Sequence, residues 1–248
     1  MGIADKIYLE NYYVNNPLKF YIKPLRLRNF FVACAEILKI ILAKLGILEW
    51  EFNERVIERP FVFQHLPENK GARILDIGCA DSIMPIEMAS LGYEVYGNDY
   101  KIYPFRHPKF KFIVGDALNL KFSDNFFDAI TCISVLEHVG LSKDFGEATK
   151  ERKDKLLMEK IRKMLKKKGI LILTVSFGIS RILSNKHTRV YNSAECKLLF
   201  SSWKKLAERY FYYNEKANAW LESSAEFLEK ITKEKNRETV AMFVLEKI

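Results

Sequence analysis

Ala72-Arg-Ile-Leu-Asp-Ile-Gly-Cys-Ala-Asp-Ser82 is the stretch of sequence that decides the fold. An apolar run leads to Asp76, turns through small residues at 78, 80 and 82, and continues into an apolar-periodic helix over 83–91. Small residues let the backbone turn sharply and approach a ligand closely. The first turn of the following helix directs unpaired N–H groups toward that ligand. The stretch therefore predicts a nucleotide-type binding loop between a strand and a helix.

Composition describes a globular chain with an ample core. The 248 residues are 49% hydrophobic and 29% charged, with only 11 Gly and 7 Pro, which argues against wholesale disorder. Length alone allows one large domain or a domain with an appendage. The four Cys have no paired spacing, so we expect neither a zinc site nor a disulfide framework. Together with a start that lacks an apolar signal-peptide core, this pattern favours a cytoplasmic protein.

Alternating strand and helix patterns surround the loop. Alternation of this kind implies a mostly parallel sheet with helices on both faces. Strands are predicted at 72–77, 93–98, 110–114, 127–133 and 169–176, and helices at 52–66, 82–91 and 147–168. The last of these helices places Leu157, Ile161, Met164 and Leu165 on one face. The run from Lys166 to Gly169 would complement its dipole and stop it.

The C-terminal part follows a different pattern. Helices are predicted at 194–204 and 223–235, and strands at 206–213 and 239–246. Two strands joined by an excursion that contains a helix are typical of an antiparallel sheet edge. We therefore predict one α/β domain over 51–248, with its ligand site at the ends of the parallel strands.

Residues 1–50 are predicted to form a separate helical extension rich in aromatic and basic residues. From 29 to 48 the chain is nearly all apolar, and its charges, Glu36, Lys39 and Lys44, fall within one arc of a helical projection. Three charges in so short a run disfavour a membrane-spanning helix. Two interpretations stay open: a helix packed against the main domain, or peripheral membrane contact through 29–50.

Acidic residues close successive predicted strands. Asp99 ends the strand at 93–98, about twenty residues after the loop, where an acid can accept from both ribose hydroxyls. Asp116 follows the third strand, where a carboxylate can accept from an adenine amino group. The fourth strand opens into the polar tip Ser134-Val-Leu-Glu-His138. Ligands bind at the carboxyl ends of parallel strands, so these groups predict one continuous site.

These stretches carry a family resemblance. Residues from about 55 to 178 resemble the class I S-adenosylmethionine-dependent methyltransferases of the broad methyltransferase-11 type. The matching stretches are Ile74–Cys79, Gly92–Asp99, Gly115–Ala117, Phe126–His138 and Leu165–Val175. The resemblance implies an α/β, three-layer, Rossmann-like fold with a seven-stranded mostly parallel sheet and an antiparallel last strand. It also implies S-adenosylmethionine as cofactor, bound over the carboxyl end of the sheet.

The resemblance assigns expected roles to residues of the binding site. Asp99 would contact the ribose, Asp116 and Ala117 the adenine, and Gly78 with the backbone around Ala80 the methionine part. Ala80 and Ser82 stand where the family has glycine, and a positive φ at 80 would cost about 1 kcal/mol. The full predicted cofactor-binding set is Asp76, Gly78, Cys79, Ala80, Asp99, Tyr100, Asp116, Ala117 and Ser134.

Methyl transfer to a hydroxyl requires a base that takes a proton from the acceptor. His138 lies at the tip of the fourth strand, although it could equally be a structural residue of a strand-to-helix turn. His187 follows the fifth strand, where this fold usually places acceptor-binding residues. Glu137 is the third candidate, with a helix-capping or ribose-side contact as its alternative. No spacing of Asp, Glu and His indicates a metal site.

The acceptor is not named by the sequence. The fourth strand lacks the Asn/Asp-Pro-Pro-aromatic motif of enzymes that methylate exocyclic amino groups of nucleic acid, and Cys132 lies inside a strand without a neighbouring Pro. A small-molecule, glycan or lipid-linked acceptor is therefore favoured for O- or N-methylation. A net charge of +9 keeps an RNA methyltransferase as an alternative. A non-catalytic binding or scaffold protein is the third reading, and the oligomeric state is left open.

Overall fold

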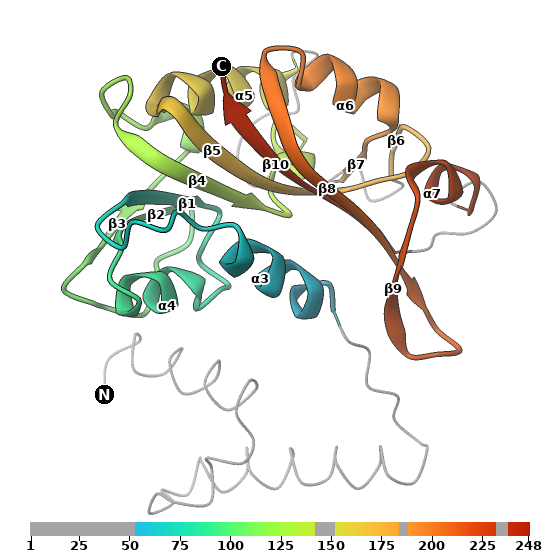
Figure 1. The fold of residues 1–248 in the computed structure, drawn as a ribbon, viewed down its shortest axis with the longest axis horizontal. Coiled ribbons are helices and arrows are strands. Elements are labelled where there is room, and N and C mark those ends of the chain that lie inside the picture. The colour runs from blue at the N-terminus through green and yellow to red at the C-terminus, as the bar shows by residue number, and fades with distance from the viewer. Residues whose placement is uncertain (1–52, 142–151, 184–187, 232–237) are drawn as a thin grey trace, which may run out of the picture. The chain divides into compact units, whose positions relative to one another are not determined.

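The computed structural model describes residues 53–141, 152–183, 188–231 and 238–248 (Figure 1). The predicted extension over 1–50 and the membrane contact through 29–50 lie outside these residues, and so does His187. Within the described part of the chain, every helix falls short of the length and apolarity that crossing a bilayer demands.

One eight-stranded sheet is the centre of the fold. Its spatial order is β3-β2-β1-β4-β5-β10-β8-β9. The strands are β1 (Arg73–Ile77), β2 (Glu94–Asp99), β3 (Phe110–Val114), β4 (Phe127–Ile133), β5 (Leu165–Ser176), β8 (Trp203–Asn214), β9 (Ala219–Ser223) and β10 (Thr239–Lys247). The short strands β6 (Arg181–Ile182) and β7 (Arg189–Val190) form a separate pair.

Strand directions agree with the predicted fold class. The strands β1 to β5 pair in parallel, so their carboxyl ends meet at one edge of the sheet. The last strand, β10, is antiparallel to both of its neighbours, β5 and β8. The prediction of a mostly parallel sheet with an antiparallel last strand is confirmed, and β9 adds an eighth strand at the edge.

Helices cover both faces of the sheet and make three layers (Figure 1). The helices α3 (Arg55–Gln64) and α4 (Met84–Ser90) pack on one face, where Val62 and Met88 are fully buried. The helices α5 (Lys153–Met164), α6 (Ser193–Leu199) and α7 (Ala225–Ile231) contribute to the core on the other face. The short turns η2 (Ala117–Asn119) and η3 (Leu136–His138) follow β3 and β4.

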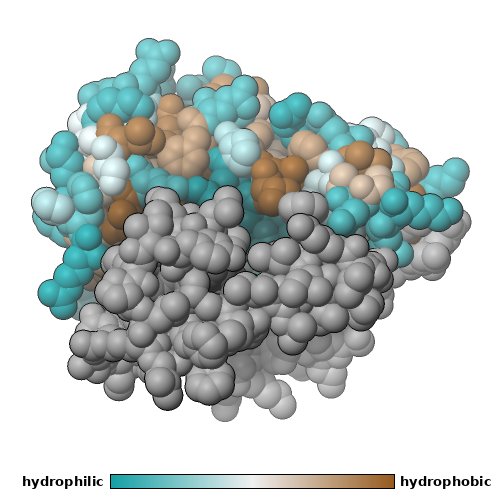
Figure 2. Space-filling view, turned by 90° about the horizontal axis from the view of Figure 1, so that it is seen from below, coloured by the Kyte–Doolittle hydropathy of each residue, from teal (hydrophilic) through white to brown (hydrophobic). Residues whose placement is uncertain are grey.

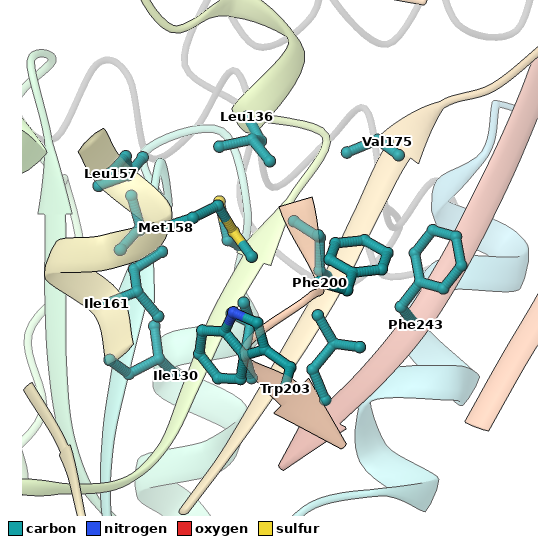
Figure 3. Packing of buried hydrophobic residues seen from close by; sticks show 14 of the residues in the cluster. Ile130, Leu136, Leu157, Met158, Ile161, Val175, Phe200, Trp203 and Phe243 are labelled. Atoms are coloured by element: carbon teal, nitrogen blue, oxygen red, sulfur yellow. The ribbon is translucent and has the colours of Figure 1, made fainter. Parts of the chain in front are cut away.

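The predicted apolar face of α5 is confirmed. Leu157, Ile161 and Met164 follow one another at helical spacing, and all three are buried. Figure 3 shows Ile161 beside Ile130 of β4 and Leu157 further along the same helix, with Trp203 at the start of β8 in the same apolar cluster. This packing fixes α5 against the strand whose tip reaches the candidate site.

The predicted end of this helix is wrong. α5 ends at Met164, and Leu165–Lys168 already belongs to β5, whose pairing with β4 places Leu165 opposite Phe127. The ladder shifts register between Phe127 and Ala129. Lys168 has a φ of +60° beside this irregularity. Gly169 is therefore part of a strand and not a helix stop, and Arg162 and Lys163 supply the cations of the last helical turn.

The C-terminal boundaries also needed correction. The helix predicted at 194–204 ends at Leu199, because Trp203 starts β8 and pairs with Lys247. The strand β9 was not predicted, and the helix expected from 223 begins at Ala225. The sequence of β9, Ala-Trp-Leu-Glu-Ser, has no alternation of apolar and polar residues that would mark a strand.

The described surface is mostly hydrophilic where Figure 2 displays it, with hydrophobic residues in separate patches. The large apolar side chains that are exposed come from scattered elements, among them Ile102, Leu198 and Leu206. Isolated exposed apolar residues are normal for a folded domain. These scattered residues therefore do not indicate a binding surface.

Candidate cofactor-binding site

A pocket of about 250 Å³ lies at the carboxyl ends of the parallel strands. Its walls come from the turns after β1, β2, β3 and β4, which is where ligands of open parallel sheets bind. Among its lining residues are six that the sequence predicted: Gly78, Asp99, Tyr100, Asp116, Ala117 and His138. The prediction that four strand ends form one site is therefore consistent with the geometry.

Two glycines shape the pocket. Gly78 has a φ of +73°, and its N–H donates to the Asn98 carbonyl at 2.7 Å. A Cβ at this position would lie 2.2 Å from Cγ2 of Val135, so a side chain is excluded. Gly115 has a φ of +137° with no atom within 4 Å of its ideal Cβ position. A side chain there would project into open space beside the pocket, which fits a cradle for a bulky ligand.

Ala80 does not have the positive φ that would make it costly. Its side chain is buried, and its N–H donates to Asp99 Oδ2 at 2.9 Å. The alanine thus occupies an ordinary backbone conformation and fastens the loop to the end of β2. The substitution of glycine by alanine in this loop is compatible with a functional pocket.

Asp99 is held rigidly at the pocket wall. Its Oδ1 accepts from the Lys101 N–H at 2.9 Å, while Oδ2 accepts from Ala80. A carboxylate offers about four lone-pair sites, so each oxygen can accept one more hydrogen bond. The Lys101 ammonium forms an exposed ion pair with Asp81 at 2.7 Å at the rim. This carboxylate is therefore oriented in advance for a ligand that presents hydroxyl donors.

Asp116 caps the short turn η2. Its Oδ1 accepts from the Leu118 N–H at 2.8 Å, which fixes the carboxylate beside Ala117. Tyr100 lies nearby: burial, and then the charge of Asp116 and a hydrogen bond to it, raise the pKa of the phenol to about 12. The phenol therefore stays protonated and donates at neutral pH.

Asp76 lies beneath the loop and is not among the pocket-lining residues described. It is 1% exposed, and its Oδ1 accepts from the Thr131 hydroxyl at 2.6 Å. Its Oδ2 has no hydrogen-bond partner among the described residues. Burial raises the pKa of this carboxyl to about 7, against the opposing effects of Thr131 and Arg55.

The side chain of Cys79, another predicted site residue, points away from the pocket and into the core. Its side chain is 1% exposed and packs against Gly97 of β2, where an added Cβ would lie 2.8 Å from the sulfur. Burial raises the pKa of this thiol. Only its backbone is placed to contribute to the loop. Cys132 is likewise a buried thiol with a raised pKa, as expected for a residue packed inside β4.

Ser134 directly follows β4 and has a left-handed conformation, with a φ of +52°. Its hydroxyl donates to Oε1 of Glu58 in α3 at 2.7 Å, and its N–H donates to the Thr174 hydroxyl oxygen at 2.9 Å. Thr174 in turn donates to the same Glu58 oxygen at 2.5 Å. Ser134 was predicted as a cofactor-binding residue, but its side chain belongs to this network. The next residue, Val135, does line the pocket.

The three predicted base candidates have different positions. His138 is exposed and lines the pocket, whereas Glu137 is 2% exposed. Glu137 Oε1 accepts from the N–H of Ser176 at 3.3 Å, and its Oε2 has no partner among the described residues. Burial, and then the nearby charge of Glu58, raise the pKa of Glu137 to about 8. His187 lies outside the described residues.

Sequence reasoning missed the contribution of α3. Glu58 is fully buried, and it forms an ion pair with Arg55 one helical turn earlier. A signal was present, because Glu58 shares one helix face with Phe61 and Val62, which are apolar and buried. A charged residue on an apolar face is buried with a partner or at a site.

Comparison with known proteins supports this architecture. Residues 75–173 match the sequence family described as methyltransferase domain. An uncharacterised protein of Methanocaldococcus jannaschii is 29% identical over 121 residues, which are 48% of this chain and 47% of that protein. A ubiquinone biosynthesis O-methyltransferase of Albidiferax ferrireducens is 30% identical over 86 residues, which are 30% of this chain and 34% of that protein. The chain thus aligns with less than half the length of either relative.

A solved structure shares the fold over most of this chain. A SAM-dependent methyltransferase of Methanosarcina mazei superposes with a TM-score of 0.54 at 16% identity, over 76% of this chain and 97% of that one. At this identity the likeness concerns the arrangement of the sheet and helices.

Proposed function

We propose that this chain, whose residues 75–173 match a methyltransferase domain, transfers a methyl group from S-adenosylmethionine to an oxygen or nitrogen nucleophile. The proposed acceptor is a small molecule, a glycan or a lipid-linked compound. The observation that carries the proposal is the pocket itself, in which Asp99 and Asp116 project from successive strand ends beside the open position at Gly115.

The lining residues suit an adenosine group. The Asp99 carboxylate, fixed by two backbone N–H donors, can accept from the two ribose hydroxyls. Asp116 can accept from the adenine amino group, and the missing side chain at Gly115 leaves room for the ring. Gly78 brings the backbone of the first loop close to the rest of the ligand.

The bound cofactor supplies a methyl group that is already activated by the positive sulfur. The protein then has to orient the acceptor, exclude water and accept a proton where the acceptor carries one. Val135 and His138, at the tip of β4, line the pocket, and on this proposal they face the acceptor. His138, Glu137 and His187 are the proposed candidates for proton transfer.

Calorimetry with S-adenosylmethionine tests the proposal. We expect micromolar binding by the full chain and a loss of at least tenfold for Asp99→Asn, because one charged acceptor is lost. Glu94→Gln is the matched control, since Glu94 lies on the same strand and is exposed. A wild-type chain that binds no cofactor, or an Asp99→Asn variant that binds equally well, would refute the proposed site.

The two alternative functions receive less support. The scaffold reading was motivated by Ala80, and the ordinary backbone conformation at this residue removes that motive. The RNA reading relied on the net charge of +9. One of the lysines that contribute to this charge, Lys166 in β5, is engaged with Asp128 at 2.6 Å. An RNA affinity that falls steeply with salt would support the RNA methyltransferase alternative.

A further inference from the structure

The order of strands along the carboxyl edge separates a donor side from an acceptor side. Asp116 and Asp99 follow β3 and β2, at one end of the parallel part of the sheet. Glu137 and Ser176 follow β4 and end β5, on the other side of β1. If the adenosine part occupies the first group, as proposed above, the acceptor must approach from the β4 and β5 side. The inference below rests on that proposed function.

One guanidinium acts on three buried carboxyl groups, those of Glu58 and Glu137 on this side and that of Asp76 on β1. We call Arg55, Glu58, Asp76 and Glu137 the Arg55 cluster. The three acids are 0 to 2% exposed, whereas the Arg55 side chain is 36% exposed and borders solvent. Arg55 pairs directly with Glu58, and its charge acts on Glu137 and Asp76 as well. The cluster therefore contains more acids than its single cation can neutralise.

Hydrogen bonding in the cluster is uneven. Glu58 is fully engaged, with Arg55, Ser134 and Thr174 as donors. Within the part of the chain that the structure describes, Glu137 accepts two long hydrogen bonds, from the N–H and the hydroxyl of Ser176 at 3.3 and 3.4 Å, both on Oε1. Its Oε2 has no partner among the described residues. A buried polar atom without a partner is costly and calls for an explanation.

A positively charged ligand would supply what Glu137 lacks. A second acid with an unpartnered oxygen, Asp76, lies on β1 two residues before Gly78, on the donor side, and is already bonded to Thr131. Glu137 is thus the acid left for the acceptor. An ammonium group has three N–H donors and a full charge, whereas a hydroxyl offers one donor and no charge. Charge-assisted hydrogen bonds are also about twice as strong as neutral ones.

We propose that the acceptor is an amine, which binds as an ammonium group to Oε2 of Glu137, so that the chain is an N-methyltransferase. Binding of the ammonium drives one proton from the carboxyl of Glu137 to solvent. The ammonium then gives a proton to the carboxylate of Glu137, which leaves a neutral amine with a free lone pair.

The chemical step balances. The nitrogen lone pair forms the new N–C bond, the S–C bond of the donor breaks, and its electron pair stays on sulfur. The positive charge moves from sulfur to nitrogen. In sum, an ammonium and the sulfonium donor yield a methylated ammonium, a neutral thioether and one proton released to solvent. Glu137 is the catalytic residue of this scheme, because it contacts the nucleophile.

Isotope labelling tests the atom that receives the methyl group. An extract of the source cells is incubated with ¹³C-methyl S-adenosylmethionine and the full chain, and the products are analysed by carbon NMR. The proposal expects N-methyl resonances and a loss of at least 100-fold for Glu137→Gln, with cofactor affinity within threefold of wild type. Labelled O-methyl products would overturn the amine assignment and leave the proposed methyl transfer intact. Absent cofactor binding, in contrast, would overturn the proposed function.

A second measurement does not depend on turnover. Binding of n-butylammonium and of n-butanol to the chain saturated with S-adenosylhomocysteine is followed by ligand-observed NMR. We expect the ammonium to bind at least tenfold more tightly than the alcohol and Glu137→Gln to abolish the difference. Glu137→Asp keeps the carboxyl group and should retain part of the difference in affinity between the ammonium and the alcohol. This variant controls for a folding defect in Glu137→Gln. Equal binding of the two probes by the wild-type chain would contradict the proposal. This result is decisive even if the labelling experiment with the extract yields no methylated product.

Discussion

Ser134 is a non-glycine residue with a left-handed backbone conformation, which is stabilised by hydrogen bonds to distant parts of the chain. Glu58 accepts from its hydroxyl across 76 positions of sequence, and Thr174 accepts from its N–H across 40. Such a φ costs an L-residue about 1 kcal/mol or more. The backbone of Ser134 in turn directs Val135 over Gly78 in the pocket.

A double-mutant cycle tests whether Glu58 shapes the pocket through Ser134. We expect Glu58→Met to weaken cofactor binding about tenfold, because the left-handed turn loses its acceptor. Ser134→Gly alone should change affinity less than twofold, since glycine adopts this φ without strain. Calorimetry on the double variant should recover most of the lost affinity. A double variant that binds as poorly as Glu58→Met would show that the two residues act independently.

Glu137 should make stability depend on pH. Burial, followed by the charge of Glu58, raises the pKa of Glu137 from 4.5 to about 8 in the folded chain. Between these two values the folded state binds more protons than the unfolded state, so its stability falls as pH rises. The free energy of unfolding of Glu137→Gln relative to wild type should therefore increase by on the order of 2 kcal/mol between pH 6 and pH 9.

Urea unfolding of both proteins at the two pH values gives this difference directly. Asp76, whose pKa is also raised, titrates in both chains and cancels in the comparison. A pH-independent difference between wild type and Glu137→Gln would mean that Glu137 is ionised in the folded protein.

At the scale of elements, the junction between α5 and β5 concentrates local strain. Lys168 has a φ of +60° where the β4–β5 ladder changes register. Lys168→Gly should therefore stabilise the chain by about 0.5–1 kcal/mol. Lys167→Gly, at a neighbouring position of β5 without a positive φ, should destabilise it by a similar amount. Denaturant midpoints of the two variants provide the measurement, and equal effects of the same sign would contradict this account.

Elements with strong local signals could be predicted from the sequence, and those decided by distant contacts could not. The strands β1 to β4 were placed within a residue, because apolar runs and turn residues mark them. The lysine run after Met164 is as suitable for a helix end as for a strand start, and pairing with Phe127 decides between them. The acids at the strand ends were found from spacing. The position of Glu58 depends on partners 76 and 116 residues away.

At the scale of the whole molecule, we propose that the segment over 29–50 contacts a membrane surface. The basis is the nearly all-apolar run over 29–48, whose three charges fall on one arc of a helical projection. Flotation with vesicles that contain anionic phospholipid should then carry the full chain upward. A chain that lacks 29–50 should stay at the bottom of the gradient. Equal partition of both would exclude a membrane role for this segment.

The position of β10 has a consequence for how the chain is made. This strand lies between β5 and β8, both of which are synthesised before it. Until residues 239–247 leave the ribosome, β5 and β8 both lack their shared neighbour, and their unpaired backbone groups can pair with other chains. The central sheet can therefore close only after residues 239–247 have been synthesised. A ribosome that stalls before Thr239 would release a chain with an open, aggregation-prone seam.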